Sequence, residues 1–323
     1  MEAALVLSGV TKTFGEMRAV DRLDLEVPRG TLCGVIGPNG AGKTTTIRIL
    51  MSILFPDSGS VSILGHRSAL LAKDRIGYLP EERGLYRKMR VGEFLLYMAR
   101  LKGVPDGESR PFIQQALERL GLTASAGKRC EELSKGMQQK VQLIAATVHR
   151  PDLLILDEPF SGLDPVSTRM LRELILEEHR RGATILFSTH VMPHAEELCD
   201  RVVMIHQGRK VLDESVAAIR HQYDPRSLEF EPLDPASDLS LLSTMPDVER
   251  VETTDGVTRV TLSPGSDPSG AIARITASVP TARIQIARLG LEDVFVQLVA
   301  TDDENGGAEL RAGLRTAERL EAL

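Results

Sequence analysis

One glycine-rich segment of this sequence has the residue types and spacing of a phosphate-binding loop. The pattern is Gly-x4-Gly-Lys-Thr, and the segment consists of Gly37, Pro38, Asn39, Gly40, Ala41, Gly42, Lys43, Thr44 and Thr45. Glycines let backbone N–H groups curve around a phosphate, and the N-terminus of a following helix attracts negative charge. We expect Lys43 to reach the β- and γ-phosphates of a nucleotide and the Thr44 hydroxyl to bind Mg²⁺. A chance glycine-rich turn is the alternative, but the apolar strand before the segment and the helix after it favour the phosphate loop.

A second candidate site is the pair of adjacent carboxylates Asp157 and Glu158, which follows the apolar residues 153–156. Successive strand residues point in opposite directions, so Asp157 can face Mg²⁺ while Glu158 turns toward an attacking water molecule. Phosphoryl transfer to water needs little beyond such positioning and neutralisation of charge. The alternative is that the pair only caps the next helix. Together with the upstream phosphate loop, the pair favours nucleotide hydrolysis.

Three further segments, in order along the chain, resemble motifs of the nucleotide-binding subunit of ATP-binding-cassette (ABC) transporters. Residues 133–138 (LSKGMQ) are similar to the family's signature sequence, residues 161–164 to its D-loop, and residues 188–190 to the segment with its switch histidine. Phe14 stands where the family stacks an aromatic ring on adenine. The resemblance covers residues 5–220. It implies an α/β P-loop NTPase core of ABC type that binds ATP and Mg²⁺ and hydrolyses ATP.

The resemblance also assigns roles to single residues. Those expected to bind the nucleotide in addition to the phosphate loop are Phe14, Glu81, Ser134, Gly136, Gln138 and Asp164. Ser134 and Gly136 precede a predicted helix over 137–148, so a hydroxyl and free N–H groups would face the γ-phosphate held by a second subunit. His190 would contact the γ-phosphate and the water held by Glu158. A helix cap and an ordinary hydrogen-bonded histidine are the interpretations of these residues without the resemblance.

Two segments depart from the family pattern. Glu81 follows residues 78–80, where the family usually has a glutamine that senses Mg²⁺ and touches the membrane subunit. A carboxylate is a good ligand for a hard cation, so we expect Glu81 to join Thr44 and Asp157 as a Mg²⁺ ligand. In the signature, Lys135 and Met137 replace small or polar residues, which predicts a variant but working signature.

The charge distribution predicts more than one domain in these 323 residues. Residues 1–220 contain 30 Lys and Arg against 27 Asp and Glu, whereas residues 221–323 contain 9 against 18. We therefore expect an ATP-binding domain over 1–220, with a helical part at about 89–149, and an acidic accessory domain over 221–300. Residues 301–323 are predicted to be a flexible tail with a possible short helix over 310–323.

Hydrophobic periodicity predicts different folds for the two domains. The first alternates strands with helices, which indicates an α/β sheet. Its predicted strands are 31–36, 153–156, 183–187 and 202–205, and its predicted helices are 44–51, 137–148, 166–180 and 193–199. The second follows a β-α-β-β-α-β order, a ferredoxin-like α+β arrangement with a closing helix. Its predicted strands are 227–231, 248–253, 258–263 and 283–287, and its predicted helices are 239–245, 269–277 and 291–300.

The narrower resemblance concerns transport. Residues 81–86, 134–139 and 291–295 together are similar to bacterial and archaeal ABC ATPases of sodium-, drug- or antibiotic-export type with an extra C-terminal domain. No apolar run approaches the ~20 residues that span a bilayer, and the N-terminus resembles no secretory signal. The resemblance therefore implies a separate multi-span permease, a second ATP-binding subunit in a head-to-tail homodimer, and a cytoplasmic location at the inner face of the membrane.

Other functions have less support. A soluble ABC-type ATPase of translation or DNA repair is the alternative, but the chain has one phosphate loop and no room for a coiled coil between Lys43 and Ser134. The net charge of −6 argues against a nucleic-acid partner. A GTPase would need an Asn-Lys-x-Asp motif, which is absent from the sequence. The cysteines, Cys33, Cys130 and Cys199, are too widely spaced for a metal motif and are predicted to be core residues.

Overall fold

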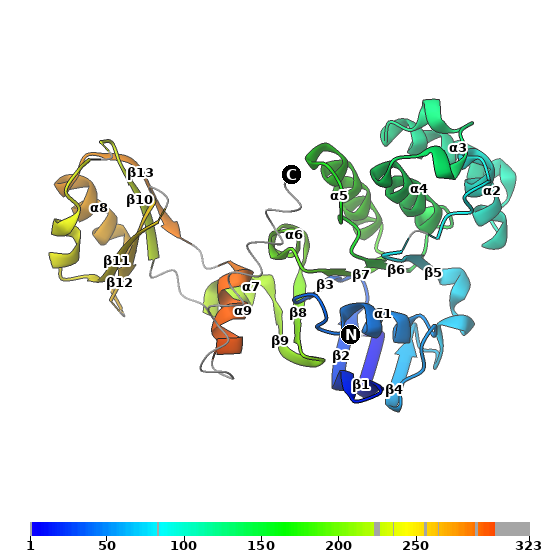
Figure 1. The fold of residues 1–323 in the computed structure, drawn as a ribbon, viewed down its shortest axis with the longest axis horizontal. Coiled ribbons are helices and arrows are strands. Elements are labelled where there is room, and N and C mark those ends of the chain that lie inside the picture. Colours follow the sequence, from blue (N-terminus) through cyan, green and yellow to red (C-terminus); the bar gives the residue numbers. More distant parts are fainter. Residues whose placement is uncertain are drawn as a thin grey trace. The chain divides into compact units, whose positions relative to one another are not determined.

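The computed structural model describes residues 2–82, 84–222, 227–234, 236–254, 257–263, 265–287 and 290–300. The chain divides into two compact units, one of residues 217–294 and the other of the remaining described residues (Figure 1). Because the larger unit resumes at Phe295, the last helix belongs to both units. The boundary expected near residue 221 stays a prediction, and the predicted tail over 301–323 lies outside the described residues.

The larger unit is organised around a six-stranded sheet with the order β5-β6-β7-β3-β8-β9. Its neighbouring strands are parallel except for the antiparallel pair β8–β9. Every residue of β3, β6 and β7 is buried, which explains the apolar run within each of these strands. Two of the six strands, β5 and β9, were not among the predicted elements. The strands are β3 (Leu32–Ile36), β5 (Ile76–Leu79), β6 (Leu153–Asp157), β7 (Thr184–Thr189), β8 (Arg201–His206) and β9 (Arg209–Ser215).

Helices cover both faces of this sheet. α5 (Pro165–Arg180) and α6 (Met192–Leu198) lie on one face, and α1 (Lys43–Leu50) lies on the other (Figure 1). α5 begins where the side chain of Asp164 accepts a hydrogen bond from Ser167 N, and Pro165 occupies its first position, where a missing N–H costs nothing. On the other face, α1 follows directly after β3, and the connection between them is the predicted phosphate loop.

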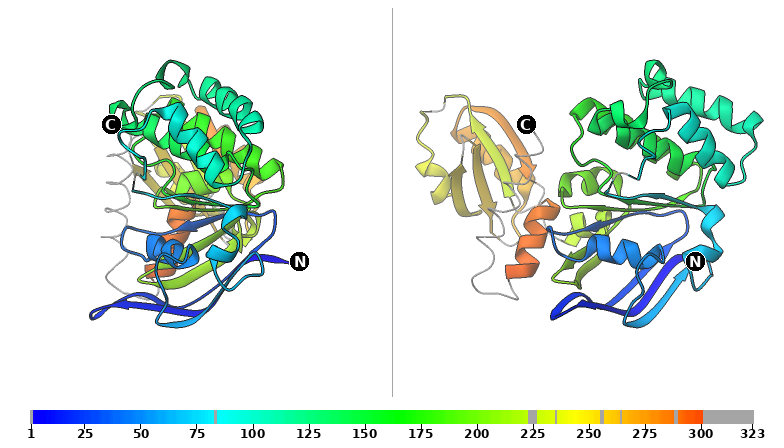
Figure 2. Two further views of the ribbon diagram at one scale, coloured as in Figure 1. Left: turned by 90° about the vertical axis from the view of Figure 1, so that its right-hand side faces the viewer. Right: turned by 45° about the vertical axis from the view of Figure 1, so that its right-hand side comes forward.

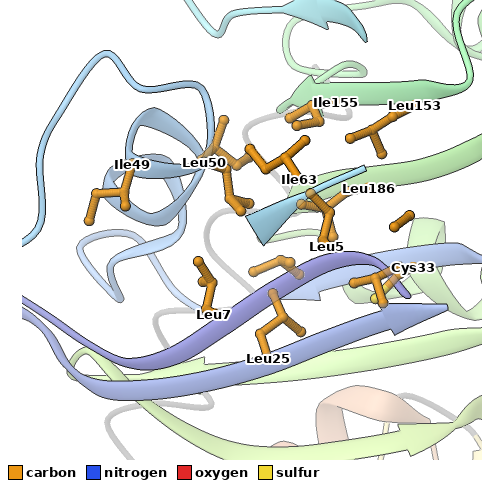
Figure 3. Packing of buried hydrophobic residues seen from close by; sticks show 14 of the residues in the cluster. Leu5, Leu7, Leu25, Cys33, Ile49, Leu50, Ile63, Leu153, Ile155 and Leu186 are labelled. Carbon is orange, nitrogen blue, oxygen red and sulfur yellow. The ribbon is translucent and has the colours of Figure 1, made fainter. Parts of the chain in front are cut away.

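A second, antiparallel sheet packs below α1 and has no counterpart among the predicted elements. It consists of β1 (Ala3–Phe14), β2 (Met17–Pro28) and β4 (Ser58–Ile63), in the order β2-β1-β4. Buried and exposed residues alternate along the second half of β2, so period-two hydrophobicity was the available signal. The core between the two sheets joins Leu5, Leu7, Leu25 and Ile63 to Ile49 and Leu50 of α1 and to Leu153, Ile155 and Leu186 (Figure 3). Each such buried side chain contributes roughly 1.5–3 kcal/mol of transfer free energy.

The segment between β5 and β6 forms the predicted helical part. It contains α2 (Val91–Leu101), α3 (Asp106–Arg119) and α4 (Lys135–Thr147). Figure 2 shows these helices on the opposite side of the six-stranded sheet from β1, β2 and β4. The only strand-like pairing among its described residues is an isolated bridge between Arg90 and Arg129.

The smaller unit has the expected ferredoxin-like topology. Its four strands pair antiparallel in the order β11-β12-β10-β13. The elements are β10 (Ser227–Pro232), β11 (Val248–Thr254), β12 (Val257–Leu262), α8 (Pro268–Ser278) and β13 (Thr281–Ala287), flanked by α7 (Val216–Gln222) and α9 (Leu291–Ala300). The prediction of an α-helix over 239–245 was wrong, because this segment forms the 3₁₀ helix η5 (Ser240–Thr244). Only Leu242 of η5 is buried, and the side chain of Asp238 binds the N–H of Ser240, so packing and local hydrogen bonds sustain a single turn.

Among the described residues, no helix is both long and apolar enough to cross a bilayer. The three cysteines are buried and free, as predicted for core residues. Burial raises the pKa of Cys33 to about 12, so its thiol stays protonated at neutral pH.

Candidate active site

The phosphate loop connects the end of β3 to the first turn of α1, and two of its glycines are sterically required. Gly37 and Gly42 have φ angles of 154° and 105°. A Cβ atom at Gly37 would lie 2.1 Å from Ile205 O, and one at Gly42 would lie 2.3 Å from Ala19 O. Gly42 caps α1 without a side-chain hydrogen bond, so the N–H groups of the first turn stay available to an anion.

Lys43 folds back across this loop. Its Nζ atom donates hydrogen bonds to Gly37 O at 2.8 Å and to Pro38 O at 3.2 Å. The same atom lies 3.5 Å from Glu158 Oε1. Burial lowers the pKa of Lys43, and the negative charge of Glu158 opposes this effect. The first helical residue therefore places a largely buried cation inside the loop, where a phosphate would compensate it.

Three oxygen-bearing side chains meet beside Lys43. The hydroxyl of Thr44 lies 3.2 Å from Asp157 Oδ1 and 3.4 Å from Glu81 Oε2. Asp157 Oδ2 is buried and has no hydrogen-bond partner among the described residues. Such an orphaned carboxylate oxygen, next to a hydroxyl and a second carboxylate, fits a hard divalent cation such as Mg²⁺. Within the described residues no three His, Cys, Asp or Glu side chains form a metal cluster, so the candidate set is two carboxylates and a hydroxyl.

Ser188 contacts both residues of the acidic pair and was not predicted as a site residue. Its hydroxyl donates to Asp157 Oδ1 at 2.6 Å and accepts the backbone N–H of Glu158 at 3.0 Å. Burial raises the pKa of Asp157, and the hydrogen bond from Ser188 counteracts part of this rise. Asp157 and Ser188 are register partners in the parallel pair β6–β7. A polar residue near the end of a buried neighbouring strand was the sequence signal for this contact.

Glu158 and His190 form a hydrogen-bonded pair at the edge of the same sheet. His190 Nδ1 lies 3.0 Å from Glu158 Oε1. Glu158 is only 8% exposed, and its φ angle of 47° is unusual for a residue other than glycine. Such strain is typical of residues whose side chain is held in a functional direction. The oxygen that would accept a proton from water is thus held between a histidine and the Lys43 ammonium.

The other predicted nucleotide-binding residues have different surroundings. Phe14 is 45% exposed, and Lys12 Nζ lies 5.6 Å from the centre of its ring. Asp164 accepts hydrogen bonds from Ser167, the contacts that hold its pKa below the usual range. Thr45 is half-buried on α1. Among the described residues, none of the hydrogen bonds of Phe14 or Asp164 reaches the phosphate loop.

The signature segment forms the exposed beginning of α4. The hydroxyl of Ser134 accepts the N–H of Met137 at 3.3 Å, as an N-cap residue does. A Cβ atom at Gly136 would lie 3.2 Å from Leu163 Cδ2, so a larger residue would press on the D-loop. Gln138 Nε2 donates to Cys130 O and Leu133 O, both at 3.2 Å. The amide of Gln138 is therefore bound within its own segment instead of facing outward.

Comparison with known proteins identifies the family. Residues 20–161 match the family model described as ABC transporter. The chain is 39% identical to the uncharacterized ABC transporter ATP-binding protein YhaQ of Bacillus subtilis, covering 91% of this chain and 98% of that one. It is 33% identical to the bacitracin transport ATP-binding protein BcrA of Bacillus licheniformis, covering 93% and 98%. A solved structure of an ATP binding subunit of an ABC transporter superposes with a TM-score of 0.63 at 32% identity, covering 68% and 93%. The resemblance seen in the motifs is thereby confirmed, and the chain belongs to the ABC transporter ATP-binding proteins, which hydrolyse ATP to power transport.

Proposed function

We propose that this chain is the ATPase subunit of an exporter and that it hydrolyses ATP with Mg²⁺ between two copies of itself. The observation that carries this proposal is the contact of Glu158 with both His190 and Lys43. The similarity to the bacitracin transport protein, which extends over 93% of the chain, supports export. Because this similarity to a transport protein extends over nearly the whole chain, a role in translation or DNA repair is disfavoured.

The roles of the site residues follow from their contacts. Lys43 exchanges its bonds with Gly37 O and Pro38 O for phosphate oxygens, which neutralises charge that builds up during the reaction. Glu158 accepts the proton of the attacking water, and His190 holds its carboxylate in position. Thr44, Asp157 and Glu81 hold Mg²⁺. When bound, the cation supplies neutralisation of the phosphate charge.

The second copy supplies the signature. Ser134 and Gly136 stand at an exposed helix N-terminus, where a hydroxyl and backbone N–H groups favour an anion. Within one chain, the described contacts of Ser134 are local to α4. The γ-phosphate held by a facing protomer is the anion that fits this position. Gln138 shapes the segment through its bonds with Cys130 O and Leu133 O.

The permease contacts the chain beside Glu81. An apolar cavity of about 280 Å³ lies between β5 and the helical part, with Tyr78, Phe94 and Met98 in its lining. Tyr86 is 52% exposed and packs edge-on against Phe94 and Tyr97. Exposed aromatic side chains next to an apolar hollow are typical of a protein interface. Through this contact the chain is held at the cytoplasmic face of the membrane.

Substitution of Glu158 tests the hydrolytic role. We expect Glu158→Gln to lower ATP turnover at least about 100-fold, because an amide cannot accept the proton. With MgATP the variant should accumulate as an ATP-bound dimer, measured by light scattering after gel filtration. Glu178, which is equally buried at 8%, is the matched control, and Glu178→Gln should retain turnover. Full turnover by Glu158→Gln would refute the assigned role.

Membrane vesicles test the direction of transport. In inside-out vesicles that contain the permease and this chain, external ATP should drive labelled bacitracin or another antibiotic inward, and Lys43→Ala should abolish uptake. ATP-dependent uptake only into right-side-out vesicles loaded with ATP would instead establish import.

A further inference from the structure

Three backbone segments meet behind the phosphate loop. The N–H of Asp21 on β2 donates to Gly208 O in the β8–β9 turn at 2.9 Å. The N–H of Gly208 in turn donates to Ala41 O of the phosphate loop at 2.9 Å. The turn is therefore hydrogen bonded to β2 on one side and to the loop on the other.

Steric contacts leave these segments little freedom to shift independently. Ala19 O of β2 lies 2.3 Å from the Cβ position of Gly42 and 2.9 Å from that of Gly208. Ile205 O, at the end of β8, lies 2.1 Å from the Cβ position of Gly37. Because the neighbouring backbone leaves no room for a Cβ atom at these glycines, a displacement of the turn is transmitted to the loop.

One buried carboxylate ties β2 to the strand that follows the turn. The side chain of Asp21 is 3% exposed, and its Oδ2 accepts a hydrogen bond from Arg209 Nε of β9 at 2.7 Å. Its Oδ1 accepts one from Arg18 Nη1 at 2.9 Å and lies 3.5 Å from Arg22 Nε. Burial raises the pKa of Asp21, but the hydrogen bonds from Arg209 and Arg18 outweigh this and hold it below its usual range. The carboxylate is therefore charged at neutral pH.

Arg18 extends the connection toward the predicted adenine site. It is the register partner of Thr13, and the next pair along the β1–β2 hairpin joins Phe14 to Met17. Asp21 is therefore connected through Arg18 to the end of the hairpin that carries Phe14, and through Arg209 to the turn that supports the phosphate loop.

We infer that Asp21 is a positioning residue for ATP binding, which fixes the Gln207–Gly208 turn against the phosphate loop and sets the loop relative to Phe14. Asp21 touches no nucleotide itself and acts through Gly208 and Arg209. The inference rests on the binding of ATP at the phosphate loop. It concerns the affinity for ATP, because Glu158 and His190, the pair proposed to act in hydrolysis, follow other strands of the sheet, β6 and β7.

Steady-state ATP hydrolysis by the purified full chain tests the inference. We expect Asp21→Asn to raise KM for ATP about tenfold, the effect of one lost charge-assisted hydrogen bond. The kcat value should change less than about twofold, because ATP that does bind meets an intact site. Asp213 is the matched control, since it lies on β9, the strand of Arg209, and its carboxylate binds Arg201 and Lys210 at 2.7 and 2.8 Å. Asp213→Asn should leave KM unchanged at a comparable loss of Tm.

A second variant covers the case in which Asp21→Asn does not fold. The Arg209 side chain is 65% exposed, so Arg209→Gln should fold and still raise KM severalfold. In the double variant Asp21→Asn/Arg209→Gln, the two increases in KM should not add, because both substitutions break the same contact. An unchanged KM in both single variants, or an equal rise in Asp213→Asn, would overturn the inference. Absence of ATP hydrolysis by the wild-type chain would instead refute the proposed function.

Discussion

The hydroxyl of Ser188 lies 2.6 Å from Oδ1 of Asp157, although 31 residues separate the two along the chain. The hydroxyl also accepts the N–H of Glu158, so one small side chain orients both residues of the acidic pair. The other oxygen of Asp157 is left without a partner among the described residues and is available to a cation. The geometry of the candidate hydrolytic site therefore depends on a residue of the neighbouring strand.

Removal of this hydroxyl should impair hydrolysis. Ser188→Ala leaves Asp157 Oδ1 and the N–H of Glu158 without this partner, which should lower kcat about tenfold and the free energy of unfolding by roughly 1–3 kcal/mol. Thr147 provides the control, since its buried hydroxyl bonds to carbonyls of its own helix. Thr147→Val should affect stability without affecting kcat. Equal kcat values for Ser188→Ala and the wild type would contradict the role of Ser188.

Alanine at Gly42 should abolish ATP binding. The added Cβ would lie 2.3 Å from Ala19 O, and the φ angle of 105° is strained for alanine. We expect at least a 100-fold loss of ATP affinity, because a small displacement of binding groups has effects of this order. Gly107 lies in α3 with no atom near its Cβ position, so Gly107→Ala should bind ATP normally. Nucleotide titration monitored by fluorescence measures the ATP affinity of both variants. Normal ATP binding by Gly42→Ala would contradict the steric requirement for glycine at this position.

Glutamine at position 81 should weaken the response to Mg²⁺. Glu81 Oε2 lies 3.4 Å from the Thr44 hydroxyl, and replacement by a neutral amide removes one negative charge from the candidate cation site. We expect the Mg²⁺ concentration for half-maximal ATPase activity to rise about tenfold. Glu82, whose side chain pairs with Arg48 at the surface, is the neighbouring control. The same Mg²⁺ dependence for Glu81→Gln and Glu82→Gln would exclude Glu81 as a ligand.

His149 should make the fold less stable in mild acid. Burial, aided by the charge of Lys102, lowers the pKa of His149 from 6.5 to about 4. The unfolded chain thus binds this proton more readily than the folded one, so the contribution of His149 is fully present above about pH 6.5 and declines as the pH falls toward 4. His149→Gln should reduce the fall in Tm between pH 7 and pH 5, measured by calorimetry. If Tm depends on pH in the same way in the variant and the wild type, the acid sensitivity comes from groups other than His149.

The phosphate loop and the acidic pair could be recognised in the sequence because each motif is local. The phosphate loop needs a strand, six residues and a helix in direct succession, and β3, Gly37–Gly42 and α1 meet this requirement. The acidic pair needs only the end of one apolar strand. The antiparallel sheet of β1, β2 and β4 escaped prediction, since its irregular alternation is a weaker signal than a continuous apolar run. The helix over 239–245 failed because a short segment with one buried residue gains little from packing.

By itself, the sequence determined which groups are the candidates for the reaction, since the residue types and spacing within 37–45 and 157–158 predict their chemistry. Only the tertiary structure decided what holds them. Ser188 reaches Asp157 through the register of two parallel strands, and Asp21 reaches Arg209 across 188 residues. Such contacts depend on which strands pair and in what register, and those are set by packing of the whole core and not by any local pattern.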